Sequence, residues 1–193
     1  MTGLERIAAA FATARAENRA ALMPYLTAGF PDRAAFLRDA RLLLEHSDLL
    51  EVGFPYSDPL GDGPTIQASG QQALAGGMTT AGVLDLISEL SGLGRPVMAM
   101  TYYNPIYCFP GGERGFLEAL AASGAAGVIL PDLPPEEAAT VRATAAELGL
   151  ATVFLIAPTT TPERLRTVTA ACSGFVYCVS VTGVTGARSN VAA

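Results

Sequence analysis

The stretch GVILPDLPPEEAATVRATAAELGLATVFLI, residues 127–156, shows the pattern that decides the fold. It begins with a short apolar run, continues through an amphipathic segment opened by prolines and acids, and returns to a second apolar run. Apolar runs of this length, bounded by Gly, Pro or Asp, are typical of strands that are buried on both faces. The stretch therefore predicts two parallel strands joined by a right-handed helical crossover.

The same alternation extends in both directions along the chain. Six apolar runs predict buried strands at Ala21–Thr27, Asp48–Gly53, Pro96–Thr101, Gly127–Pro131, Ala151–Ile156 and Gly174–Ser180. The amphipathic segments between them predict helices at Arg33–His46, Thr80–Ser91, Gly112–Ser123, Pro135–Leu148 and Pro162–Ala171. Residues 1–18 predict a further helix, whose apolar stripe contains Leu4, Ile7, Ala8 and Phe11.

Two folds contain this alternation: a doubly wound open sheet and a (β/α)8 barrel of the TIM type. No GxGxxG follows the first predicted strand, and loops rich in Gly and Pro follow nearly every strand, which favours the barrel. A closed barrel needs eight βα units and about 250 residues. We therefore expect residues 1–193 to form a single (β/α)-barrel domain with about six of the eight units, incomplete at its C-terminus.

Composition excludes several classes of protein. Half of the 193 residues are hydrophobic, 16% are charged and the formal net charge is -6, which argues against a disordered chain and a nucleic-acid binder. No apolar run is long enough to span a bilayer, so we expect no membrane association. Cys108, Cys172 and Cys178 form no CxxC pair, and His46 is the only histidine. The sequence thus predicts no metal site and reduced thiols in a cytoplasmic protein.

Glu51 is an acid inside a predicted buried strand. Because side chains alternate along a strand, Leu49, Glu51 and Gly53 share one face, and Leu50 and Val52 share the other. If Leu50 and Val52 pack against the helices, Glu51 points into the barrel, where an unpartnered carboxylate is costly. A perturbed acid at such a place indicates function. The alternative interpretation is a structural ion pair or an acid in solvent at the strand end.

Two further acids, Asp58 and Asp62, follow in a loop dense with Pro and Gly. Two acids close to Glu51 suit general acid–base chemistry, although Asp-Pro and Asp-Gly are also ordinary turn pairs. The Gly-rich segment at residues 182–189 could bind a phosphate through its backbone N–H groups. Tyr102 and Asp132, at the ends of the third and fourth predicted strands, are either ligand contacts or turn residues.

Several segments together resemble the tryptophan synthase α-chain family, over essentially the whole chain. They are residues 23–29 (MPYLTAG), 51–67 (EVGFPYSDPLGDGPTIQ), 100–105 (MTYYNP), 131–137 (PDLPPEE), 157–160 (APTT) and 180–186 (SVTGVTG). The string at 51–67 is the most specific of these. The resemblance implies a lyase that cleaves indole-3-glycerol phosphate to indole and glyceraldehyde 3-phosphate in tryptophan biosynthesis.

The resemblance also implies roles for individual residues. Glu51 matches the catalytic glutamate that moves protons to indole C3 and from the glycerol hydroxyl. Asp62 matches the aspartate that binds the indole N–H, and Tyr177 matches a tyrosine that lines the site near Glu51. The remaining matched positions bind substrate: Tyr25, Met100, Tyr102 and Leu130 in or beside the indole pocket, and Thr185 and Gly186 in a loop that closes over the phosphate.

The partner implied by the resemblance is the β subunit of an α2β2 heterotetramer, which carries pyridoxal phosphate and receives the indole. No metal or organic cofactor is expected in this chain. The loops Pro55–Asp62 and Tyr103–Phe109 are expected to face the β subunit. In phosphate-binding barrels the loops after strands seven and eight hold much of the phosphate, so we expect the 193-residue chain alone to be inactive or nearly so, and poorly stable.

Two alternative functions stay open at this point. One is another phosphate-binding barrel enzyme, such as a phosphoribosylanthranilate isomerase or an indole-glycerol lyase that works without a β subunit. The other is a non-catalytic barrel fragment that only binds and modulates a β-type partner. Glu51→Gln separates an enzyme, which would lose most of its rate, from a binding module, which would be unaffected.

Overall fold

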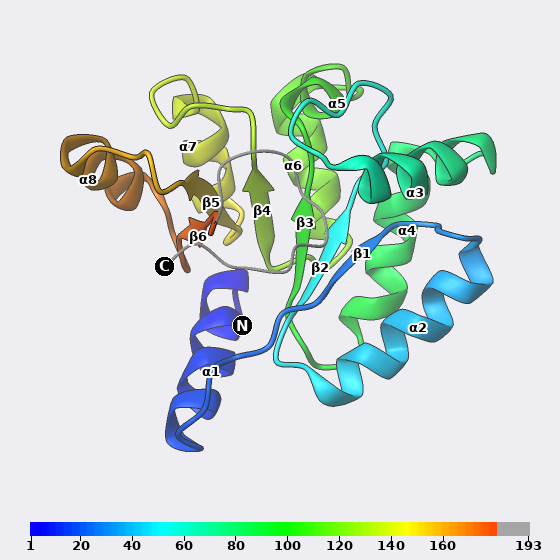
Figure 1. Cartoon of the computed structure of the whole chain (residues 1–193), viewed down its shortest axis with the longest axis horizontal. Coiled ribbons are helices and arrows are strands. Elements are labelled where there is room, and N and C mark those ends of the chain that lie inside the picture. Colours follow the sequence, from blue (N-terminus) through cyan, green and yellow to red (C-terminus); the bar gives the residue numbers. More distant parts are fainter. Residues whose placement is uncertain (181–193) are drawn as a thin grey trace.

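A single parallel sheet of six strands organises the computed structural model, which describes residues 1–180 (Figure 1). The strands are paired in chain order, each parallel to the next. Their bounds are β1 Tyr25–Thr27, β2 Leu50–Gly53, β3 Val97–Met100, β4 Gly127–Leu130, β5 Ala151–Ile156 and β6 Tyr177–Cys178. All six lie within the predicted runs, and their parallel pairing confirms the predicted alternation.

The helices connect the strands as crossovers, with α1 before the first strand. Their bounds are α1 Gly3–Ala16, α2 Arg33–His46, α3 Pro64–Ala75, α4 Thr80–Ser91, α5 Tyr103–Tyr107, α6 Gly112–Ala122, α7 Ala139–Glu147 and α8 Pro162–Ala171. The side chains of Thr2, Asp32, Thr79 and Thr161 each accept a backbone N–H at a helix start, as N-cap residues do. Within residues 1–180, no helix combines the length and apolar character that a membrane crossing needs.

The two faces of the sheet bury different partners, and this distinguishes the two folds that the sequence left open. One apolar cluster joins Leu50, Val52 and the alternate residues of the later strands to helices α2, α4, α6, α7 and α8. A second cluster joins Leu49, Met98 and Ile129 to α1 alone. A doubly wound sheet carries crossover helices on both faces, whereas a barrel carries them on the outside only. The helices thus surround the outer face of a barrel-like sheet, as predicted.

Helix α1 buries a face that overlaps the predicted apolar stripe only in part. Leu4 and Ile7 contact the inner cluster as expected, but Ala8 is exposed and Phe11 is 36% exposed. The helix instead buries the smaller residues Gly3, Ile7, Ala10 and Ala14. A Cβ on Gly3 would lie 1.9 Å from the carbonyl oxygen of Ala126, so close backbone approach to the sheet, not side-chain size, sets the rotation of α1.

Three helical segments differ from the sequence prediction. The helix predicted from Pro135 begins only at Ala139, because residues 135–137 form a separate turn. Asp132 does not cap it but accepts the N–H of Tyr103 at 2.9 Å and 3.1 Å, at the start of α5. Helices α3 and α5 were not predicted. The sequence of α3 carries one signal for a helix start, the proline at its first position. The sequence of α5 carries no such signal.

Candidate active site

Glu51 lies on the inner face of the sheet at β2, as the alternation of side chains predicts. Its side chain is 2% exposed, and its Oε1 has no hydrogen-bond partner among the described residues. Its neighbours across the ladder are Tyr25 on β1 and Met98 on β3. Burial raises the pKa of Glu51 to about 7, because the charged carboxylate loses its hydration. A carboxyl group that titrates near neutral pH can both donate and accept a proton.

Tyr177 begins β6, at the other end of the described sheet, and its phenol interacts electrostatically with Glu51. Burial is the main reason that the pKa of Tyr177 rises to about 12, and the nearby Glu51 adds to the rise. Two residues that are 126 positions apart in the sequence are thus brought into one site. Because Tyr177 stays protonated at neutral pH, it can offer a hydrogen bond but not a charge.

Asp62 is held in the loop after β2 by Tyr102, which follows β3. The Tyr102 hydroxyl accepts the backbone N–H of Gly61 at 2.9 Å and forms a hydrogen bond with the Asp62 carboxyl group. Burial raises the pKa of Asp62, and the hydrogen bond from Tyr102 lowers it. The ring of Tyr102 packs on that of Tyr56, with centroids 5.3 Å apart. Tyr102 therefore anchors the loop at Gly61 and at Asp62 itself, and the Asp62 carboxyl group has a defined place.

Four predicted site residues line one small pocket at the carboxyl ends of β2–β4, and one of them, Tyr25, comes from the start of β1. The pocket is lined by Tyr25, Gly53, Phe54, Asp62, Met100, Thr101, Tyr102 and Pro131. Gly53 is essential to its shape, because a Cβ there would lie 2.1 Å from the Tyr25 hydroxyl oxygen. The Tyr25 phenol interacts electrostatically with both Asp62 and Glu51, so it lies near both acids.

The structure does not bring every predicted site residue to the lining of this pocket. Glu51 and Tyr177 interact with each other but do not line it. Leu130 is 1% exposed and packs in the outer cluster, because it shares the helix-facing side of β4 with Val128. Asp58 is exposed and accepts a hydrogen bond from the adjacent Ser57. Thr185 and Gly186 lie outside the described residues.

Two buried hydroxyls that the sequence analysis did not single out complete the surroundings of Tyr25. Thr27 on β1 lies 3.3 Å from the Tyr25 hydroxyl oxygen, and Ser69 on α3 lies 2.7 Å from the Thr27 hydroxyl oxygen. Thr27 shares the face of Tyr25 by the period of two, which is a local signal. Ser69 carries no such signal, because its place depends on how α3 packs against β1.

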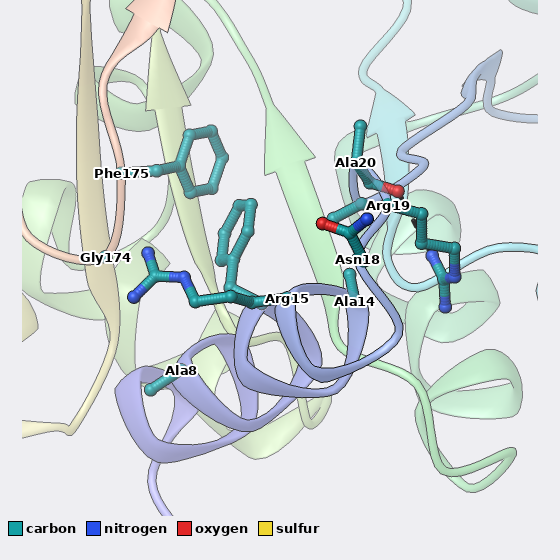
Figure 2. Close-up of a pocket in the computed structure, with 10 residues that line it drawn as sticks. Ala8, Ala14, Arg15, Asn18, Arg19, Ala20, Gly174 and Phe175 are labelled. Carbon is teal, nitrogen blue, oxygen red and sulfur yellow. Dashed lines mark hydrogen bonds between the residues drawn. The ribbon is translucent and has the colours of Figure 1, made fainter.

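A larger hollow lies at the opposite end of the strands, between α1, the segment before β1 and the segment before β6 (Figure 2). Phe11 and Phe175 line it, with ring centroids 5.9 Å apart. Arg15 and Arg19 line it as well. In (β/α) barrels the chemistry takes place at the carboxyl ends of the strands. We therefore assign the candidate site to the pocket beside Glu51 and not to this hollow.

Other chemistry-bearing residues lie apart from the pocket. Within residues 1–180, no group of three or more His, Cys, Asp or Glu residues is arranged to hold a metal ion. Cys108, Cys172 and Cys178 are free thiols. His46 is exposed at the last position of α2, where a basic residue interacts favourably with the helix dipole.

The arrangement as a whole is suited to proton transfer on an apolar ligand. Glu51 is a buried carboxyl group without a partner at Oε1 among the described residues, whereas Asp62 is a half-buried carboxyl group hydrogen-bonded to a phenol. Two carboxyl groups in different environments can take different roles at one pH. Apolar and aromatic walls from Phe54, Met100 and Tyr102 lower the local dielectric constant, which strengthens the interaction of either acid with a developing positive charge.

Comparison with known proteins identifies the family. The family model "Tryptophan synthase alpha chain" matches residues 11–193. A tryptophan synthase alpha chain from Deinococcus radiodurans is 53% identical over 191 residues, which are 98% of this chain and 70% of the relative. One from Gloeobacter violaceus is 49% identical over 190 residues, covering 97% of this chain and 68% of the relative.

Solved structures agree with the sequence comparison. A structure of Mycobacterium tuberculosis tryptophan synthase matches with a TM-score of 0.90 and 44% identity, over 95% of this chain and 71% of that chain. The alpha subunit from Legionella pneumophila matches with a TM-score of 0.84 and 34% identity, over 93% and 68%. The resemblance indicated by the sequence segments is confirmed, and this chain belongs to the tryptophan synthase alpha chain family.

Proposed function

We propose that this chain carries the acid–base residues for aldol-type cleavage of indole-3-glycerol phosphate to indole and D-glyceraldehyde 3-phosphate. The observation that carries the proposal is Glu51: a carboxyl group 2% exposed on the inner face of the sheet, without a hydrogen-bond partner at Oε1 in the described residues. A buried carboxyl group of this kind retains a proton near neutral pH, and its Oε1 is available to a substrate atom as a hydrogen-bond partner.

The reaction divides between the two acids. Glu51 in its protonated form delivers a proton to indole C3, which places positive charge on the indole ring and its nitrogen. Asp62, as a carboxylate, accepts the indole N–H and stabilises that charge in the apolar pocket. Glu51, now ionised, takes the proton of the glycerol hydroxyl as the bond between C3 and the glycerol carbon breaks. The electron pair of that bond returns to the indole ring, and the carbon that loses it becomes the aldehyde.

The proposed reaction asks for no metal or organic cofactor in this chain. Tyr177 helps to keep Glu51 in place, and Tyr25, Met100 and Tyr102 form walls of the indole pocket. The described sheet has six strands, whereas phosphate in such barrels is held largely by loops after strands seven and eight. We therefore propose that residues 1–193 alone cleave the substrate slowly, because they bind its indole ring but bind its phosphate group only weakly.

The experiment is indole release from indole-3-glycerol phosphate, measured for residues 1–193 and for a version extended by two βα units, each with and without β subunit. We expect indole from the extended version, and its loss in Glu51→Gln and Asp62→Asn. Asp58→Asn is the matched control, because Asp58 is an exposed acid in the same loop. Indole release that survives Glu51→Gln would refute the proposal.

We further propose a β-type partner for the surface formed by the loop after β2 and by α5. Pro55, Tyr56 and Ser57 line a groove together with residues 104, 105 and 108–110. Two large apolar side chains stand out in these segments, Leu60 at 88% and Tyr107 at 66% exposure, and exposed apolar groups of this size often mark an interface. Leu60→Asp and Tyr107→Asp should each weaken co-purification with β subunit. Leu42→Asp should not, because Leu42 is an exposed apolar residue on α2, outside this surface.

The non-catalytic binding module is the second candidate, and the same assay addresses it. A chain that bound β subunit and changed its activity, while the extended version released no indole, would favour that function. An indole-glycerol lyase that works without a partner would instead release indole at a rate that β subunit does not change.

A further inference from the structure

Three hydroxyls, from the half-buried Tyr25 and the buried Thr27 and Ser69, form a chain from the candidate pocket to helix α3. The Tyr25 hydroxyl oxygen lies 3.3 Å from Thr27 Oγ1, and Thr27 Oγ1 lies 2.7 Å from Ser69 Oγ. Ser69 Oγ lies 2.8 Å from the backbone carbonyl oxygen of Ile66. Thr27 and Ser69 are each 7% exposed, so water has little access to this part of the chain.

The carbonyl at its end gives this chain of hydrogen bonds a direction. A carbonyl oxygen only accepts, so Ser69 uses its single hydroxyl proton on Ile66. Ser69 Oγ must then accept from Thr27, which uses the only Thr27 hydroxyl proton. Thr27 Oγ1 must in turn accept from Tyr25. The Tyr25 O–H therefore points away from the pocket, and its oxygen is left with lone pairs only.

The Tyr25 phenol stands where its direction matters to the chemistry. Its neighbour across the β1–β2 ladder is Glu51, and the titratable groups that act on it are Asp62, Glu51 and Tyr102. Glu51 also interacts electrostatically with Tyr177 on β6, and it raises the pKa of that phenol. The absent Cβ of Gly53 lets the phenol lie across β2, since a Cβ there would be 2.1 Å from the hydroxyl oxygen.

We propose that Thr27 and Ser69 are positioning residues, which turn the Tyr25 O–H away from the pocket so that Tyr25 offers Glu51 and the substrate a hydrogen-bond acceptor and not a donor. A donor at this point would stabilise the Glu51 carboxylate and deplete the acid form that delivers the C3 proton. An acceptor leaves the acid form in place and favours a substrate group with an O–H or N–H beside it. The inference rests on the proposed lyase function only for the identity of that substrate.

The first test is the pH titration of the Glu51 carboxyl carbon by ¹³C NMR, in the ligand-free 193-residue chain, with the signal assigned from Glu51→Gln. Thr27→Val keeps the shape of the side chain but removes its hydroxyl, which frees the Tyr25 proton to turn towards Glu51. We expect the pKa of Glu51 to fall by about one unit, the effect of one new hydrogen bond. Thr27→Ser keeps the hydroxyl and should leave the titration unchanged.

Ser69→Ala gives an independent test from outside the pocket. It removes the acceptor of the Thr27 proton, so Thr27 can donate to Tyr25 and again release the phenolic proton. We expect a fall in the pKa of Glu51 in the same direction as in Thr27→Val. This variant changes a helix residue on α3, so agreement between the two would not come from damage to β1.

A double-mutant cycle shows whether the effect passes through Tyr25. In a Tyr25→Phe background, Thr27→Val should no longer move the Glu51 titration, because no phenolic proton is left to turn. A shift of equal size in that background, or equal shifts in Thr27→Val and Thr27→Ser, would overturn the inference. The titration needs no turnover, so the predicted shifts together with a version extended by two βα units that released no indole would refute the lyase proposal alone.

Discussion

Glu51→Gln should make the protein more stable in alkaline solution and leave it nearly unchanged in acid. Burial raises the pKa of Glu51 from 4.5 to about 7, so the folded state holds a proton that the unfolded state releases between these two values. Stability that depends on this proton falls as pH rises from 4.5 to 7 and stays low above pH 7. At about 1.4 kcal/mol per pKa unit, the loss is about 3 kcal/mol. Glutamine cannot ionise and avoids the loss.

The assay is urea unfolding followed by circular dichroism between pH 4 and pH 9, for the parent chain and the variant. The difference in unfolding free energy should be near zero at pH 4, grow across the interval and level off above pH 7. Glu118→Gln, which removes an exposed carboxylate from α6, is the control for the loss of one negative charge. A Glu51→Gln difference that is constant with pH would refute the reasoning, because it would show that burial does not hold the proton on Glu51.

Three further predictions follow from the same contacts. Tyr102→Phe removes the hydrogen bond that lowers the pKa of Asp62, so the Asp62 carboxyl carbon should titrate at higher pH by ¹³C NMR, and an unchanged titration would contradict the contact. Gly53→Ala places a Cβ 2.1 Å from the Tyr25 hydroxyl oxygen and should cost about 1–3 kcal/mol in urea unfolding, a loss that Tyr25→Ala should largely relieve. Asp48→Asn should flatten acid unfolding: an ion pair with an arginine lowers the pKa of Asp48 from 3.8 to about 2, so its contribution is present above pH 3.8 and lost as pH falls through 2. A variant that unfolds in acid as the parent does would show that this pair is not responsible.

The strand pattern and the inward direction of Glu51 could be predicted because both depend on local geometry. Six apolar runs bounded by turn residues place six strands, since buried strands need continuous apolar sequence. Side chains alternate from one face of a strand to the other, so Leu50 and Val52 against the helices require Glu51 on the inner face.

The same alternation explains where the family resemblance and the pocket disagree. By resemblance Leu130 was placed in or beside the indole pocket, whereas the structure places it on the outer face with Val128, buried against the helices. The alternation of side chains along β4 already places Leu130 on the same face as Val128. Applied to every strand and not only to β2, it would have predicted that the pocket is reached by Pro131 and not by Leu130.

What only the tertiary structure decided are the contacts between elements that lie far apart in the sequence. Thr27 meets Ser69 across 42 residues, Tyr102 meets Gly61 across 41, and Asp132 caps α5 across 29. A hydrogen bond depends on donor and acceptor lying within about 3 Å of each other, which is set by how strands and helices pack and not by spacing along the chain. The rotation of α1 has the same origin, because the close approach of Gly3 to the sheet outweighs the apolar stripe written in its sequence. The chain thus encodes locally which residue types stand at the ends of the strands, and packing decides which of them meet.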